Sequence, residues 1–181
     1  MHRIAPVIVL LLIVLSVAEA RAGEPFPDLV LEGWLPAFQR EYLGVDDDPP
    51  SLSDIRTGYI LIEIMNMYCS HCQLDAPTVN EVYQYLDNRG YSSRVKMVVI
   101  AAGNSQFEVD FFRNKYSVPM PIFTDQNYVA YRAVGGMGTP YFFLVRKHED
   151  GRLESVFSKA GHIKDKDRFI KAVLVAAGYN G

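Results

Sequence analysis

Residues 63–72 read EIMNMYCSHC, an apolar run that ends in the two cysteines of the chain, Cys69 and Cys72. The residues from 59 to 67 are apolar on both faces apart from Glu63 and Asn66, which is typical of a central parallel strand. Two cysteines separated by two residues can close a small disulfide ring or share a metal ion. The stretch therefore predicts a redox or metal site at the end of a buried strand.

The composition fits one globular domain. The chain has 181 residues, 49% of them hydrophobic, and a net charge of -3, which is enough apolar material for a substantial core. The charges are interspersed and form no basic stripe of the kind that nucleic acid needs. We therefore expect no binding to nucleic acid, and we expect a monomer.

The first twenty residues have the pattern of a secretory signal peptide. A basic start precedes an apolar run at 4–17, and residues 18–20 (AEA) provide an A-x-A cleavage site. The apolar run is shorter than the roughly 20 residues that a spanning helix needs, which favours cleavage over the alternative of a retained N-terminal membrane anchor. We predict a signal peptide at 1–20, a mature domain at 21–181, and export to the periplasm or a similar compartment in which disulfides persist.

Strand and helix patterns alternate along the chain and then give way to a hairpin and a closing helix. This order predicts a three-layer α/β/α sandwich around a central sheet. The spacing of Ser105 and Glu108 is that of a capping box, which opens a helix. The predicted strands are 59–67, 96–102, 121–125, 141–146 and 153–159, and the predicted helices are 33–43, 73–88, 105–116, 127–134 and 164–177.

The first of these helices carries large apolar side chains. Trp34, Leu35, Phe38 and Tyr42 have helical spacing within residues 33–43. Side chains with this spacing share one face of a helix, which would pack on the core. We therefore expect Trp34 to be buried.

Cys69 is the candidate attacking thiol. A thiol attacks a disulfide only as the thiolate, and a cysteine at the start of a helix has its negative charge stabilised by unpaired N–H groups and the helix dipole. His71, in the same turn, can add positive charge. Cys72 lies one turn deeper, from where it can attack a mixed disulfide on Cys69 and release the product. Glu63 is the candidate proton acceptor for Cys72 if it is buried, since burial raises a carboxyl pKa; the alternative is a solvated sheet edge.

The order of these motifs resembles the thioredoxin fold. A strand leads to C-x-x-C at a helix start, Pro77 lies five residues beyond Cys72, and Thr139-Pro140 precedes a later strand. The resemblance implies a thioredoxin-like sandwich with a mixed central sheet. It also implies that the Thr139-Pro140 peptide bond is cis, which the sequence alone would not justify.

Three further features resemble the exported TlpA/ResA-type thiol–disulfide oxidoreductases. These are the export signal, the phrase SLSD at 51–54 before the first core strand, and an extra strand-helix insert around 125–135. The resemblance covers roughly residues 25–178. It implies an enzyme whose partners are thiols or disulfides of exported proteins and a redox-recycling protein, with a membrane-bound protein among the candidates, and it implies neither a cofactor nor a resident metal.

The resemblance also implies roles for individual residues. Cys69 would be the nucleophile and Cys72 the resolving thiol, so that Cys69-Cys72 is a redox-active disulfide, and Glu63 would be the buried proton acceptor. Thr139 and Pro140 would lie on the substrate face. Tyr68 stands where the family usually has Trp, so the substrate-contacting surface beside the thiol differs from that of typical members.

Two questions stay open at this point. Ser70-His71 differs from the Pro-rich pair of many reductive members, and a histidine there resembles disulfide oxidases and isomerases, so the direction of electron flow is undecided. The alternative function is a module that binds Cu(I) or another soft metal through the two cysteines, with His71 or His162 as a further ligand. A lone histidine such as His162 is more often a turn or surface residue. A permanent structural bridge between the cysteines is the third hypothesis.

Overall fold

The computed structural model of the chain describes residues 23–46 and 48–179; the predicted signal peptide lies outside them. Within the described residues, no helix is long and apolar enough to cross a lipid bilayer. The strands are β1 (Glu24–Pro25), β2 (Tyr59–Met65), β3 (Val95–Ala102), β4 (Ile122–Asp125), β5 (Tyr141–Lys147) and β6 (Leu153–Ala160). The α-helices are α1 (Ala37–Leu43), α2 (Ser70–Asn88), α3 (Gln106–Tyr116), α4 (Val129–Ala133) and α5 (Lys166–Ala176), with short 3-10 helices at Leu52–Asp54 and Tyr91–Ser93.

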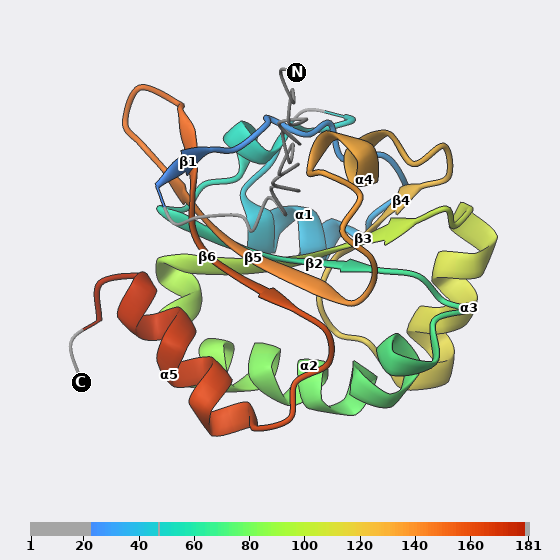
Figure 1. Cartoon of the computed structure of the whole chain (residues 1–181). Coiled ribbons are helices and arrows are strands. Elements are labelled where there is room, and N and C mark those ends of the chain that lie inside the picture. Colours follow the sequence, from blue (N-terminus) through green and yellow to red (C-terminus); the bar gives the residue numbers. More distant parts are fainter. Residues whose placement is uncertain (1–22, 47, 180–181) are drawn as a thin grey trace, which may run out of the picture.

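The described strands form one mixed sheet in the order β1-β6-β5-β2-β3-β4. β2 pairs in parallel with β3, which pairs in parallel with β4, whereas β5 is antiparallel to both β2 and β6. In Figure 1, α2 and α5 lie below the sheet, and α1 and α4 lie above it. The predicted three-layer α/β/α sandwich with a mixed central sheet is confirmed.

The central strand β2 divides its side chains between two cores. All seven of its residues are buried, and successive side chains of a strand point to opposite faces. Leu61 and Met65 belong to the core between the sheet and the helices α2 and α5. Ile60, Ile62 and Ile64 belong to the core on the opposite face of the sheet. The same alternation places Glu63 on the face that α2 covers.

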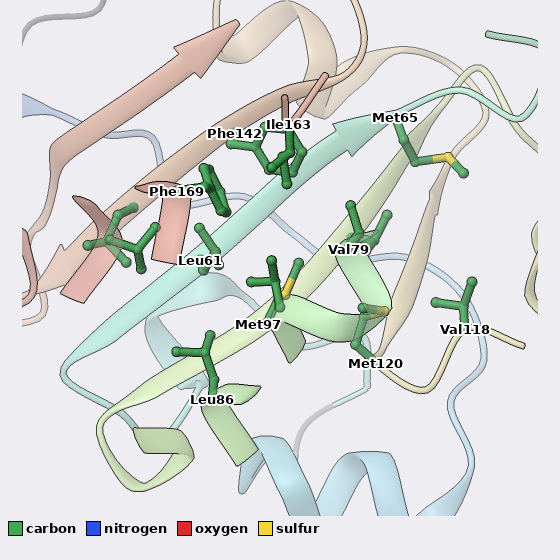
Figure 2. Packing of buried hydrophobic residues seen from close by; sticks show 14 of the residues in the cluster. Leu61, Met65, Val79, Leu86, Met97, Val118, Met120, Phe142, Ile163 and Phe169 are labelled. Carbon is green, nitrogen blue, oxygen red and sulfur yellow. The ribbon is translucent and has the colours of Figure 1, made fainter. Parts of the chain in front are cut away.

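The core on the α2 face is the platform for the start of that helix. It is made of fully buried aliphatic and aromatic side chains, each of which stabilises the fold by roughly 1.5 to 3 kcal/mol when removed from water. Figure 2 shows its members converging from the sheet, α2 and α5, among them Leu61, Met97, Phe142, Val79, Leu86 and Phe169.

The prediction for Trp34 is wrong. The first helix begins at Ala37 with Pro36 as its N-cap, so Trp34 precedes it, and the Trp34 side chain is 66% exposed. A residue before proline is disfavoured in the helical region, which prevents the helix from extending back through Leu35. Leu35 is buried nonetheless, and Phe38 is exposed.

The predicted capping box at α3 is confirmed. The Ser105 hydroxyl accepts a hydrogen bond from the Glu108 N–H, and the Glu108 carboxylate accepts one from the Ser105 N–H at 2.7 Å. Such a reciprocal pair satisfies two backbone donors at the helix start. Of the apolar residues that follow, Phe112 is buried, whereas Phe107 and Phe111 are exposed.

Candidate active site

A short turn after β2 presents Cys69 at the N-cap of α2. The side chain of Asn66 holds this turn, because its amide donates to the carbonyl of Ala102 on β3 at 2.7 Å and its oxygen accepts from the Tyr68 N–H at 2.8 Å. The Cys69 N–H donates to the Asn66 carbonyl at 3.0 Å. The sequence predicted that Cys69 stands at a helix start, and the structure places it there.

The surroundings of the Cys69 sulfur favour the thiolate. Cys69 is half-buried, and burial alone would raise the pKa of its thiol, but hydrogen bonds from the Thr139 side chain and from the N–H groups of Cys72 and His71 outweigh it, so the pKa lies below its usual value. In the protonated form, the thiol donates to the Thr139 carbonyl at 3.2 Å. The environment therefore favours the thiolate of Cys69, which is the form that attacks a disulfide.

Cys72 has the opposite properties. Its side chain is only 1% exposed. Burial raises the pKa of the Cys72 thiol, and the nearby charge of Glu63 raises it further. Cys72 is therefore held as a thiol that needs a base before it can attack.

Glu63 is buried rather than placed at a solvated sheet edge. Burial raises the pKa of Glu63 to about 8, with further contributions from the charges of Asp75 and Cys69. Glu63 and Cys72 line one small cavity between the sheet and α2, together with Asn80 and apolar side chains. The carboxyl group therefore titrates within the pH range in which a general base for the thiol would operate.

A second buried carboxyl group, which the sequence analysis missed, belongs to Asp75 of α2. It is 3% exposed, and its Oδ2 accepts a hydrogen bond from the Ile163 N–H at 2.8 Å. Its Oδ1 lies 3.7 Å from Nδ1 of His162, and the His162 ring stacks on that of His71 with centroids 5.6 Å apart. Burial raises the pKa of Asp75. The loop after β6 thus brings His162, for which a turn or surface position was expected, against the cysteine motif.

The predicted substrate-face residues lie at the same end of the sheet. The Thr139-Pro140 bond is cis, and the Thr139 carbonyl is the one that contacts Cys69 Sγ. Tyr68 precedes the nucleophile, is 69% exposed and donates its hydroxyl proton to Glu108 of α3. Thr139 therefore contacts Cys69 directly, and Tyr68 is its neighbour in the chain.

Cys69 and Cys72 are not bonded to each other in this structure. In the part of the chain described, no group of three or more His, Cys, Asp or Glu side chains is placed to hold a metal ion.

Comparisons with known sequences identify a family and several relatives of the chain. Residues 22–165 match the model of the AhpC/TSA family. The chain is 21% identical over 122 residues to the thiol-disulfide oxidoreductase ResA of Geobacillus kaustophilus, a match that covers 67% of each chain. The matched regions span 58% to 67% of the lengths of the ResA relatives.

Two solved structures show the same architecture. The thiol:disulfide interchange protein DsbE from Chlorobium tepidum superposes with a TM-score of 0.67 at 18% identity, over 88% of this chain and 100% of that one. A secreted disulfide oxidoreductase of Mycobacterium tuberculosis superposes with a TM-score of 0.52 at 17% identity, over 66% of this chain and 83% of that one. These matches confirm the predicted thioredoxin-like fold and the resemblance to ResA-type proteins. Because the family match extends over most of its residues, the chain belongs to the AhpC/TSA family.

Proposed function

We propose that the protein is a thiol–disulfide oxidoreductase that exchanges disulfides with exported proteins through Cys69 and Cys72. The contrast between the two thiols carries this proposal: Cys69 is half-buried with a lowered pKa, whereas Cys72 is buried with a raised pKa. Such a pair supports sequential attack, in which one thiol reacts with the substrate and the other then resolves the product.

Each step of the exchange has a candidate residue. The Cys69 thiolate attacks one sulfur of a substrate disulfide, which forms a mixed disulfide and releases the other sulfur as a thiolate. Cys72 then loses its proton to the Glu63 carboxylate and attacks Cys69 Sγ, which closes the Cys69-Cys72 disulfide and releases the second substrate thiolate. Two electrons pass from the dithiol to the substrate, and the reverse sequence oxidises a substrate dithiol.

Export is part of the proposal and rests on two observations. The residues at 1–20 have the composition of a cleavable signal, and one structurally similar oxidoreductase is described as secreted. The expected partners are thus extracytoplasmic protein thiols and a redox protein that recycles the cysteine pair. Thr139, Pro140 and Tyr68 are the proposed contacts for an extended substrate segment.

Trapping experiments test the exchange. The full chain is reduced and mixed with a peptide that carries one internal disulfide, and the products are alkylated and weighed by mass spectrometry. We expect wild type to reduce the peptide, Cys69→Ser to be inactive, and Cys72→Ser to accumulate a mixed disulfide at Cys69. Turnover by the Cys69→Ser protein at the wild-type rate would refute the proposed function.

The reduction potential of the cysteine couple decides the direction of electron flow. It is measured by equilibration with glutathione buffers followed by thiol alkylation. A reduction potential of about -120 mV identifies a disulfide donor, and one of about -270 mV identifies a reductase.

A further inference from the structure

The strand-helix insert contacts the substrate loop in two ways. Backbone hydrogen bonds from the N–H groups of Gly135 and Gly136 to the carbonyls of Arg132 and Tyr131 hold the start of the loop, and the Tyr131 hydroxyl holds its further part. Tyr131 of α4 donates its hydroxyl proton to the Gly136 carbonyl, with 2.9 Å between the oxygens, and the same hydroxyl accepts a hydrogen bond from the Gly138 N–H at 3.1 Å. The two contacts span the segment 135–138 that leads into Thr139. We call residues 135–138 the glycine loop.

The glycine loop needs such an anchor. Three of its four residues are glycines with positive φ, at 99° for Gly135, 63° for Gly136 and 82° for Gly138, and all three are exposed. Glycine visits these conformations without steric cost, but it also has the largest conformational freedom to lose. Without a fixed partner, a loop of this composition would sample many arrangements.

Tyr131 is itself held to the sheet. Asp125, buried at the end of β4, accepts hydrogen bonds from the N–H groups of Ala130 and Tyr131 at 3.1 and 2.8 Å. The Tyr131 ring packs edge-on against that of Tyr128. A continuous set of contacts therefore runs from a buried carboxylate through α4 to the glycine loop.

The far end of the loop is the backbone beside the nucleophile. Gly138 is followed directly by Thr139, whose carbonyl lies 3.2 Å from Cys69 Sγ. α4 lies on the face of the sheet opposite α2 (Figure 1). The glycine loop therefore connects a helix on one face to the backbone beside Cys69, which stands at the start of the helix on the other face. A shift of the glycine loop would move the Thr139 backbone relative to the sulfur.

We propose that Tyr131 is a positioning residue that fixes the glycine loop, and thereby the Thr139 backbone, for capture of an extended disulfide substrate beside Cys69. The inference rests on the proposed function and deepens it by giving the insert a role in substrate binding. Tyr131 touches neither the cysteines nor the reacting sulfurs in this scheme. It acts through the loop alone.

Removal of the hydroxyl should weaken substrate capture and leave the chemistry intact. A neutral hydrogen bond contributes about 0.5 to 1.5 kcal/mol net, and a loop that is only partly in its binding arrangement lowers apparent affinity by the missing fraction. Tyr131→Phe should therefore raise the half-saturating concentration of a disulfide peptide about three- to tenfold. Once the peptide is bound, the loop is in its binding arrangement, so the limiting rate should stay at its wild-type value.

The experiment compares Tyr131→Phe with the matched control Tyr128→Phe in the full chain. Both remove one tyrosine hydroxyl from the same insert and keep the ring. Rates of reaction of the reduced proteins with an internally disulfide-bonded peptide are measured across peptide concentrations. Amide hydrogen exchange at Gly138, followed by NMR, reports the loop independently of activity, and we expect it to accelerate in Tyr131→Phe alone.

The outcomes separate this inference from the proposed function. If wild type does not react with the peptide, the proposed function fails, and the Gly138 exchange still reports whether Tyr131 fixes the loop. If wild type reacts and Tyr131→Phe matches it in half-saturating concentration, the positioning role is refuted. Unchanged Gly138 exchange in Tyr131→Phe, or an equal loss of capture in Tyr128→Phe, would refute it as well.

Discussion

The carboxyl group of Glu63 and the thiol of Cys72 line the same cavity, although one belongs to the central strand and the other to the first turn of α2. Burial raises the pKa of both groups, and the charge of Glu63 raises that of the Cys72 thiol further. Because the pKa of Glu63 is about 8, a minor fraction of its carboxyl groups is ionised at neutral pH. This ionised fraction is the form that can accept the Cys72 proton directly within the cavity.

Replacement of Glu63 by Gln should slow the second chemical step selectively. Glutamine keeps the size of the side chain and cannot accept the Cys72 proton, and general-base assistance typically contributes about a hundredfold or more. We expect the mixed disulfide on Cys69 to form at the wild-type rate in Glu63→Gln and to resolve at least about tenfold more slowly at pH 7. Quenched-flow alkylation separates the two steps, and equal resolution rates would remove Glu63 from the mechanism.

The same substitution should change how stability depends on pH. In the folded protein Glu63 keeps its proton up to about pH 8, whereas in the unfolded chain it loses it near its ordinary value of 4.5. Between these values the unfolded chain binds fewer protons, so the free energy of unfolding falls as pH rises. From about pH 5 to about pH 8, Glu63→Gln should gain roughly 3 to 4 kcal/mol relative to wild type. Urea unfolding of the reduced proteins measures this, and parallel pH curves would contradict it.

Asp75 should influence the resolving step through Glu63. Its charge contributes to the raised pKa of Glu63, so Asp75→Asn should lower that pKa and move the pH–rate profile of mixed-disulfide resolution to lower pH. The asparagine oxygen can still accept the Ile163 N–H, whereas Asp75→Ala leaves that buried donor unpaired at a cost of about 1 to 3 kcal/mol. A profile that superimposes on the wild-type one would exclude the electrostatic link.

Replacement of His71 should change the reduction potential of the Cys69/Cys72 couple more than replacement of a histidine elsewhere in the chain. The backbone N–H of His71 contributes to the lowered pKa of Cys69 and is kept when the side chain is replaced by that of glutamine. The imidazole, when charged, would favour the thiolate further, and this is the effect that His71→Gln removes. We expect His71→Gln to raise the thiolate midpoint, read by absorbance at 240 nm, and to make the reduction potential more negative by roughly 30 mV. His148→Gln, in the distant hairpin paired with Glu154, serves as the control, and an equal shift in both variants would argue against a local effect.

Much of the fold could be predicted because its signals are local. The apolar run of β2, the capping box of Ser105 and Glu108, and the periodicity of α5 each depend on residues within one element. The start of α1 was misplaced because helical spacing was weighed above the constraint that Pro36 imposes on the residue before it. The prolines and glycines of a segment thus decide its ends even where apolar spacing suggests a longer element.

The candidate site was only partly predictable, because local spacing can be read from the sequence whereas contacts between distant segments cannot. Cys69, Cys72 and Glu63 lie within ten residues of one another, so strand and helix geometry brings them together. Asp75 follows Cys72 by one helical turn, and that spacing was a signal that could have been used. His162 reaches the site from a distant segment through the loop after β6, and Tyr131 is connected to it only by the glycine loop. No pattern in the sequence links either residue to the cysteines.

The alternation of side chains along β2 ties the chemistry to the pairing of the sheet. If β2 slipped by one residue against its neighbours, every side chain would exchange faces, and Glu63 would enter the opposite core, with the whole thickness of the sheet between it and Cys72. Isoleucine side chains of β2 would then take the place of Glu63 on the face of the sheet that α2 covers. Recovery of the proton-transfer step during refolding would therefore report that β2 has paired with its neighbours in the correct register.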